Sequence, residues 1–415
     1  MTDRALPCCE SGVTLKIIPC HDHFSLIHSP MHTSLTFLSA LKVHHTYLSQ
    51  KATSSVSFST HAHLKVRTCS SRADGPQIAV VGGGVVGLVS ALRILQDIPT
   101  SKVVVIAEKF GSDTTSHGAA GVWGPYKMSN TDESLTNRLA TETFDYLTDL
   151  FYSEDAVLAG ISLVQSNYLC KDNDPPPTWY QSVFNLHPMS AKHLSLFPAE
   201  YKHGYVFGNV TCEGRYYLPY LSDKIKGTDR GTLIQARLPS LRALCSEFMT
   251  ASGIPYELKF DAVVNCCGLG AAELVEDREV YPIRGQIIRV RAPWITHHYV
   301  AGDFYIIPNR NSVVLGGTGQ VGNWSKNSSI QDRKHIFEGC CRLIPSIAQA
   351  EVLEEWVGLR PGRSSLRLEV EIMDVGEGGR KPVVHCYGHG GSGLTLAWGC
   401  GGDVVTMLKQ SLQLL

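Results

Sequence analysis

The chain has 415 residues, of which 43% are hydrophobic and 18% are charged, and its formal net charge is -1. This composition is typical of a globular protein with a sizeable core in two or three domains or lobes. The near-zero net charge gives no electrostatic basis for nucleic-acid binding. The longest apolar runs are too short, and too often interrupted by Gly and polar residues, to predict a membrane span. The 13 cysteines are odd in number and form no C-x-x-C motif, which favours a reduced intracellular chain over a disulfide framework.

Residues 1–75 differ in composition from the rest of the chain. They contain eight of the 17 histidines and many Ser and Thr, without a sustained helical or strand period. The spacing of these histidines matches no metal site, and no metal is predicted for the chain. We interpret the segment as a disordered or leader segment. The absence of Asp and Glu from His23 to Ala73 is also typical of an organellar transit segment, and that alternative stays open.

The next stretch, "QIAVVGGGVVGLVSALRIL" at residues 77–95, predicts a dinucleotide-binding unit. A short strand rich in β-branched residues leads into a glycine turn and then into helical spacing. Gly82, Gly84 and Gly87 form G-x-G-x-x-G, which allows a tight turn, close approach of backbone to a pyrophosphate, and packing of helix on strand. The helix N-terminus offers free N–H groups to the phosphates. A second strand, "KVVVIAEKF", ends at Glu108, which is placed to accept hydrogen bonds from ribose hydroxyls.

Two further stretches bear on the identity of the dinucleotide, because the glycine motif alone is shared by sites for NAD, NADP and FAD. The run "TTSHGAAGVWGPY", residues 114–126, has small and hydroxyl-bearing residues that suggest backbone packed against a flat ligand. The run "YGHGGSGLTLAWGCG", residues 387–401, places six glycines at the start of the last predicted helix. Since glycine lowers helix stability, a cluster at this position indicates a specific structural or ligand-binding requirement.

Together these motifs resemble those of the FAD-dependent D-amino-acid oxidase and D-aspartate oxidase family. The resemblance covers about residues 77–410, follows the family's order, and does not extend to the first 75 residues. The motifs that carry it are "IAVVGGGVVGLVSAL", "DTTSHGAAGVWGPY", "VVNCCGLGA", "YPIRGQIIRVRAPW", "FYIIP", "VVLGGTGQVGNWS", "EGCCRLIPS", "VGLRPGR" and "VHCYGHGGSGLTLAWGC".

The resemblance implies an α/β fold in which a Rossmann-like FAD-binding lobe is interleaved with a mixed-sheet substrate-binding lobe. From the motif positions we assign the FAD-binding lobe to residues 76–127, 225–285 and 358–415. The substrate-binding lobe is assigned to residues 128–224 and 286–357.

Matching the family's motifs residue by residue predicts the groups that hold FAD. The C-terminal glycine run is expected to wrap the flavin ring, since glycine lets backbone rather than side chain meet the ring. The helix that follows is expected to stabilise negative charge on the ring through its N-terminus. The predicted cofactor-binding residues are Gly82, Gly84, Val85, Val86, Gly87, Glu108, Lys109, Thr115, Ser116, Gly121, Val122, Leu238, Gly390, Gly391, Ser392, Gly393, Leu394 and Thr395.

The implied reaction is FAD-dependent oxidative deamination of a D-amino acid to a 2-oxo acid, with release of ammonia and hydrogen peroxide. Its partners are the small-molecule D-amino acid and dioxygen, and a homodimer stays open. Arg360 matches the family's carboxylate-binding arginine, whose planar guanidinium can form two parallel hydrogen bonds; an internal ion pair is the alternative. Tyr305 matches a tyrosine that also meets the carboxylate, although most tyrosines on a sheet face only pack. Gly391 and Ser392 are expected beside the substrate, and no general base is required if the amine binds neutral.

The chain departs from both branches of the family around the substrate. Gly124 stands where the neutral-substrate branch has glutamine, whereas Val300 and Gly319 stand where the aspartate branch has arginines. Because a second substrate carboxylate would then be buried without a partner, neutral D-amino acids are favoured and acidic ones are the alternative. The side chains that could supply a substitute charge are Lys127, His297 and His298.

Two more departures concern the lid and the last helix. Ala301 stands at the spacing of the family's lid tyrosine, with Tyr299 nearby in a shorter loop. Gly401 and Gly402 fall where the family has helix-forming residues, and each costs roughly 1 kcal/mol relative to alanine in a helix interior. The last helix is therefore expected to fray or to begin later.

Other localisations and functions stay open at this level. The family often ends in a peroxisomal tripeptide of the S-K-L type, but this chain ends "LQLL", so a cytoplasmic location is an alternative to the peroxisome. A relative that binds FAD without turnover is one alternative function. A nicotinamide-dependent dehydrogenase is another, although it leaves the C-terminal glycine run unexplained.

Overall fold

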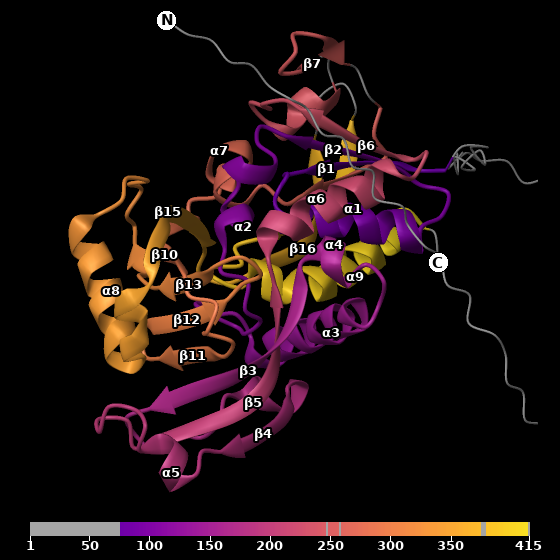
Figure 1. The fold of residues 1–415 in the computed structure, drawn as a ribbon. Coiled ribbons are helices and arrows are strands. Elements are labelled where there is room, and N and C mark those ends of the chain that lie inside the picture. Colours follow the sequence, from indigo (N-terminus) through magenta and orange to yellow (C-terminus); the bar gives the residue numbers. More distant parts are fainter. Residues whose placement is uncertain (1–74, 246–247, 257–258, 375–378, 414–415) are drawn as a thin grey trace, which may run out of the picture. The chain divides into compact units, whose positions relative to one another are not determined.

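The computed structural model describes residues 75–245, 248–256, 259–374 and 379–413, which all belong to the compact unit Ser70–Leu415 (Figure 1). The segment predicted as a leader lies outside these residues apart from Gly75. A six-stranded sheet and a nine-stranded sheet dominate the unit, and helices cover them. No helix in the described ranges is long and apolar enough to cross a membrane.

The six-stranded sheet grows from the predicted strand–helix–strand unit. β1 (Gln77–Val81), α1 (Val85–Asp97) and β2 (Lys102–Ala107) follow one another, and β1 pairs in parallel with β2 and with β9. The strand order is β16-β17-β9-β1-β2-β6, and only the β16–β17 pair is antiparallel. Its central strands are apolar on both faces, because one face packs against helices and the other packs against Leu241, Leu244 and Phe248. The other strands are β6 (Gly231–Gln235), β9 (Ala262–Asn265), β16 (Arg367–Asp374) and β17 (Arg380–Tyr387).

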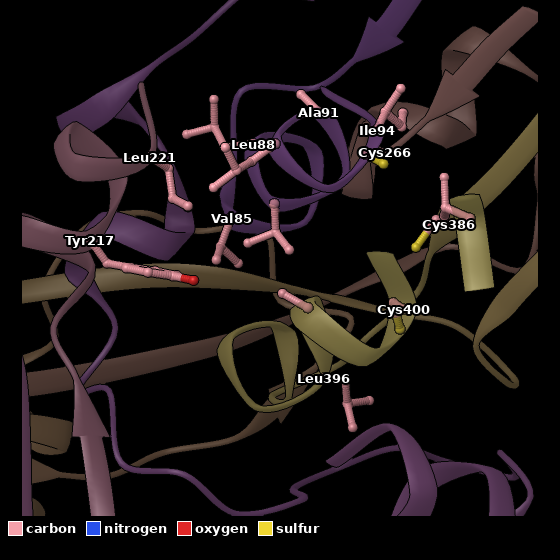
Figure 2. Close-up of a cluster of buried hydrophobic side chains, with 14 of the residues drawn as sticks. Val85, Leu88, Ala91, Ile94, Tyr217, Leu221, Cys266, Cys386, Leu396 and Cys400 are labelled. Atoms are coloured by element: carbon pink, nitrogen blue, oxygen red, sulfur yellow. The ribbon is translucent and has the colours of Figure 1, made fainter. Parts of the chain in front are cut away.

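Helix α1 lies at the centre of the largest hydrophobic cluster (Figure 2). Leu88 of α1 is buried in this cluster with Tyr217 of α6 (Gly214–Lys226) and Leu396 of α9 (Gly393–Ser411). Figure 2 shows α6 and α9 on different sides of α1. This packing fixes the N-termini of α1 and α9, where the two glycine-rich motifs lie.

The nine-stranded sheet has the order β14-β10-β13-β12-β11-β3-β5-β4, and β15 also pairs with β10. The β10–β15 pair is antiparallel and places Ile283 opposite Arg360. The helix α8 (Ile330–Leu343) packs on β10, β12 and β13. The strands are β3 (Ile161–Cys170), β4 (Phe184–Pro188), β5 (His203–Cys212), β10 (Tyr281–Arg291), β11 (His298–Ala301), β12 (Phe304–Pro308), β13 (Val313–Gly316), β14 (Gln320–Val321) and β15 (Glu351–Gly362).

Shorter elements complete the described part. β7 (Phe248–Met249) and β8 (Pro255–Tyr256) form a two-stranded hairpin. The remaining α-helices are α2 (Thr115–Gly118), α3 (Glu133–Phe151), α4 (Ala156–Ala159), α5 (Ala191–Leu194) and α7 (Ala271–Leu274). The 3-10 helices are η1 (Gly111–Asp113), η2 (Thr178–Ser182), η3 (Leu241–Cys245), η4 (Gly268–Gly270) and η5 (Pro345–Gln349).

The expectation that the last helix frays or begins later is wrong. Helix α9 begins at Gly393 and continues through Gly401 and Gly402 to Ser411. A Cβ at Gly401 would lie 3.0 Å from Cγ of Arg93 on α1, so the glycine permits close approach of the two helices. Packing against α1 therefore maintains a helix that intrinsic propensity alone would weaken.

The two sheets draw on alternating parts of the chain, and the α/β class with interleaved sheets is confirmed. Strands of the six-stranded sheet come from residues 77–107, 231–265 and 367–387. The lobe boundaries assigned at residues 285 and 357 fall inside β10 and β15. Both strands belong to the nine-stranded sheet, so these assigned boundaries lie within strands and not in the loops between them.

Candidate active site

A cavity of about 760 Å³ is lined by residues of both sheets and of the N-termini of α1 and α9. This volume lies within the range of small-molecule and cofactor sites. All of the predicted cofactor-binding residues except Gly87 and Ser392 line the cavity, as do Arg360 and Tyr305. The fold therefore brings together segments that are more than three hundred residues apart in the sequence, such as those of Gly82 and Thr395.

The first glycine motif forms part of the cavity wall. Gly82 has a φ of +129°, which L side chains rarely adopt. Gly87 lies behind the wall, because a Cβ there would collide with the carbonyl oxygen of Gly82, and it allows the helix to pack against the turn. The N–H of Val85 donates to Ser116 Oγ at 3.1 Å. The N–H of Val86 has no acceptor among the described residues and is available to an anion.

The end of β2 brings an acid and a base to the cavity. The side chains of Glu108 and Lys109 are about half exposed, and Lys109 Nζ lies 3.9 Å from Glu108 Oε1. Gln235 Nε2 donates to the backbone carbonyl of Glu108 at 3.0 Å and fixes this turn. No described side chain donates to the Glu108 carboxylate, so its oxygens can accept hydrogen bonds from a ligand.

The C-terminal glycine run packs against residues 124–127 of the "GPYK" segment. A Cβ at Gly390 would collide with the Lys127 carbonyl oxygen, and one at Gly391 would collide with the Tyr126 ring. Ser392 is fully buried behind the wall, where its Oγ accepts from the Tyr126 N–H at 2.7 Å. Ser392 thus holds the wall in place rather than lining the cavity.

Arg360 reaches the cavity from β15 across the neighbouring strand. A Cβ at Gly285 of β10 would collide with the guanidinium, so glycine leaves the space that the arginine fills. Arg360 Nη1 donates to the Thr318 carbonyl at 3.0 Å. The guanidinium carbon lies 5.7 Å from the centre of the Tyr126 ring.

Arg360 differs from the neighbouring arginines in its charge environment. In the part of the chain that the structure describes, no carboxylate forms an ion pair with Arg360. The arginines nearby in sequence differ: Arg363 Nε lies 2.9 Å from Asp277 Oδ2, and Arg367 Nε lies 2.7 Å from Glu369 Oε1. Arg360 is therefore able to bind an anionic group that enters the cavity.

Tyr305 on β12 lies beside this guanidinium. A Cβ at Gly317 would lie 2.6 Å from Tyr305 Oη, so the Gly316–Gly317 backbone makes room for the phenol. Burial raises the pKa of Tyr305 above its ordinary value, and the nearby Arg360 guanidinium opposes the rise. The phenol therefore keeps its proton at neutral pH and can donate a hydrogen bond to a carboxylate.

The three side chains named as substitute charges occupy different positions. His298 lines the cavity but is 5% exposed; burial lowers its pKa to about 3, so its imidazole is neutral. Lys127 is exposed, and its Nζ lies beside Gly319, 3.0 Å from the position that a Cβ on that glycine would take. Neither Lys127 nor His297 lines the cavity.

No lid tyrosine is present at the turn between β11 and β12. The turn consists of Gly302 and Asp303, which both line the cavity. Ala301 is buried, and Tyr299 packs with its ring centre 6.0 Å from that of Phe197, away from the cavity-lining residues.

Sequence reasoning missed several aromatic residues of the wall. Tyr126 belongs to the recognised run "GPY", whose position after Gly-Ala-Ala-Gly was the available signal. Tyr168, Trp179 and Phe207 come from a region without a recognised motif. Only their pairing in the folded sheet brings them to the cavity.

The family sequence pattern described as "FAD dependent oxidoreductase" matches residues 77–407. The chain belongs to this family. The cofactor is thus FAD, and the wall fits it: an anion-accepting helix N-terminus, a half-exposed carboxylate at the end of β2 and glycines that exclude side chains all face one cavity.

Named relatives come from both branches of the family. Human D-aspartate oxidase is 36% identical over 82% of this chain and 97% of its own length. The D-amino-acid oxidase of Rubrobacter xylanophilus is 35% identical over 80% of this chain and 96% of its own length. Among solved structures, iminodiacetate oxidase from Chelativorans sp. BNC1 has a TM-score of 0.65 at 18% identity, with 80% and 95% of the chains covered. That likeness shows the shared fold.

Proposed function

We propose that the protein oxidises D-amino acids with neutral side chains to 2-oxo acids, using FAD and dioxygen and releasing ammonia and hydrogen peroxide. The observation that carries this proposal is Arg360, whose guanidinium faces the cofactor cavity without a carboxylate partner among the described residues. The names of the relatives in both branches support the reaction class.

The protein's own contribution is to hold and orient the two reactants. The amide groups at the start of α1 and the Glu108 carboxylate would hold the pyrophosphate and ribose of FAD. Gly390 and Gly391 would let backbone meet the flavin ring. When bound, FAD supplies the acceptor for the hydride that leaves the substrate Cα and the reductant for dioxygen. Arg360 binds the substrate carboxylate, and the protonated Tyr305 donates a further hydrogen bond to it.

The preference for neutral side chains rests on the charges of the wall. Val300 lines the cavity where the aspartate branch has an arginine, and His298 in the same strand is neutral. Asp303 lines the cavity as well and would repel a second substrate carboxylate. A dicarboxylic substrate would thus leave one carboxylate without a partner.

The decisive experiment is anaerobic reduction of the FAD-loaded protein, followed by its visible spectrum. D-alanine is expected to bleach the oxidised-flavin bands, whereas L-alanine is expected to leave them unchanged. Failure of every D-amino acid to reduce the flavin would contradict the proposal and favour a relative that binds FAD without turnover. A protein that retains no flavin would contradict the cofactor-binding roles as well.

Acidic D-amino acids are the second candidate, because the Lys127 ammonium lies beside Gly319, where the aspartate branch has an arginine. If D-aspartate alone bleaches the flavin, Lys127→Ala should raise KM for D-aspartate at least tenfold. The neutral preference predicts instead that D-aspartate reduces the flavin poorly in both the wild type and Lys127→Ala.

A further inference from the structure

We propose that the protein binds a zinc ion at a buried group of two cysteines and one histidine, formed by Cys386, His389 and Cys400. The ion would join the end of β17 to α9 on either side of the C-terminal glycine run. None of the three residues is among those assigned to FAD or to the substrate. The inference therefore does not depend on the proposed reaction.

The three side chains converge although they come from different elements. Cys386 lies in β17, His389 in the turn that follows, and Cys400 in α9. One ligand atom of each residue, a sulfur or a ring nitrogen, lies within 4.8 Å of the other two. Sulfur ligands at about 2.3 Å from a tetrahedral zinc ion are roughly 3.8 Å apart, so side-chain shifts of about 1 Å would complete the site.

His389 distinguishes this group from ordinary apolar packing. Buried cysteines without a histidine usually behave as small hydrophobic side chains. The side chain of His389 is 2% exposed, and its Nε2 atom has no hydrogen-bond partner among the described residues. A buried polar atom without a partner lowers the stability of a fold and calls for a specific explanation. The imidazole therefore has a nitrogen that is available to a metal ion.

The chemistry of the group favours a thiophilic cation over a hard one. Thiolate and imidazole ligands are typical of zinc sites, whereas Mg²⁺ and Ca²⁺ prefer oxygen ligands. Cys386 and Cys400 are fully buried in the largest hydrophobic cluster. Two thiolates balance the charge of Zn²⁺, so the loaded site would be neutral and compatible with this apolar environment. Each thiol would release its proton to solvent as its sulfur–zinc bond forms.

Cys266 is placed to complete the coordination. It directly follows β9, and its thiol interacts with that of Cys386, which also interacts with Cys400. Figure 2 shows Cys386 between the other two cysteines. Cys266, Cys386 and His389 line the cavity, which gives an ion or a water molecule a route to the site. The sequence predicts no metal here, because the residues come from separate stretches of the chain.

The first test measures by mass spectrometry how much zinc the protein retains. The protein is prepared with FAD, excess zinc sulfate and a reductant that lacks thiols, and is then dialysed. The wild type is expected to retain about one zinc ion per chain, and Cys386→Ser and Cys400→Ser at least fivefold less. Cys170→Ser changes a buried cysteine of β3 outside the group and should match the wild type. Absence of zinc from the wild type, or equal retention by the wild type and both cluster variants, would overturn the inference.

The second test identifies the ligands by X-ray absorption at the zinc edge of the wild type, so it does not depend on whether the variants fold. We expect two or three sulfur atoms at about 2.3 Å and a nitrogen at about 2.0 Å from the ion. Residues 1–75 contain eight histidines, which could hold zinc adventitiously. A shell of nitrogen and oxygen alone would therefore overturn the inference. A sulfur-containing shell in a protein whose flavin no D-amino acid reduces would support the zinc site and contradict only the proposed reaction.

Discussion

The guanidinium of Arg360 is partly buried without a carboxylate partner among the described residues, and such a charge is costly to maintain in a folded protein. The surrounding sequence accommodates this group, because Gly285 leaves it space and the Thr318 carbonyl holds one of its N–H groups. A structural arginine would be expected to pair with an acid, as Arg363 does with Asp277. The absence of an acidic partner among the described residues supports the proposed role of Arg360 in binding a substrate carboxylate.

Replacing Arg360 by Lys should lower kcat/KM for D-alanine at least 100-fold, because an ammonium cannot form the two parallel hydrogen bonds of a guanidinium. The visible spectrum of bound FAD should be unchanged, since the cofactor contacts lie elsewhere. The measurement is steady-state oxygen consumption, and Arg291→Lys, an exposed strand residue paired with Glu351, is the matched control. If the kcat/KM of Arg360→Lys were within fivefold of the wild-type value, the assignment of Arg360 to substrate-carboxylate binding would be contradicted.

At the scale of the element, α9 shows why glycines occur inside a long helix. A Cβ at Gly399 would lie 2.5 Å from the Leu139 carbonyl oxygen of α3, so this glycine permits two helices to touch. A Cβ at Gly402 would come no closer than 3.4 Å to the guanidinium of Arg93. Two glycines three residues apart thus differ in function: the first is required by packing, and the second is not.

This difference predicts opposite effects of the same substitution. Gly399→Ala should lower the free energy of unfolding, because backbone atoms of α3 cannot move aside cheaply. Gly402→Ala should raise it by about 0.5–1 kcal/mol, the gain in helix propensity. Guanidinium unfolding at a fixed, saturating FAD concentration measures both variants. Stabilisation by Gly399→Ala would show that α3 and α9 do not pack as closely as described.

The elements that could be predicted from sequence are those with a local signal. The strand–turn–helix at residues 77–97 was evident because β-branched residues, a glycine motif and helical spacing follow one another. The continuation of α9 through Gly401 could not be predicted from the sequence. It depends on close packing against Arg93, which lies about three hundred residues away in the chain. Likewise, the position of Ser392 behind the wall depends on the Tyr126 backbone that it binds.

At the scale of the whole described unit, the site exists because two sheets from alternating chain segments meet at one cavity. The part of the cavity wall formed by the two glycine motifs could be predicted, since these motifs are local and specific. The substrate half could not, because Tyr168 and Phe207 reach the cavity only through the pairing of β11 with β3 and of β3 with β5. A single sequence does not show which of its distant strands pair with one another.

The burial of His298 in the nine-stranded sheet makes the free energy of unfolding depend on pH. The pKa of His298 is lowered to about 3 by burial, so between pH 6.5 and 3 the unfolded chain binds a proton that the folded protein does not. The free energy of unfolding must then fall as pH decreases through this window, by about 1.4 kcal/mol per pH unit from this residue alone.

His298→Asn, which can retain the Ser166 hydrogen bond, should flatten the decline in unfolding free energy between pH 6.5 and 4.5. His297→Asn changes a neighbouring, partly exposed histidine and is the control. If both variants lose stability as steeply as the wild type, His298 is not held neutral in the fold, and the uncharged wall proposed for the substrate loses one of its supports.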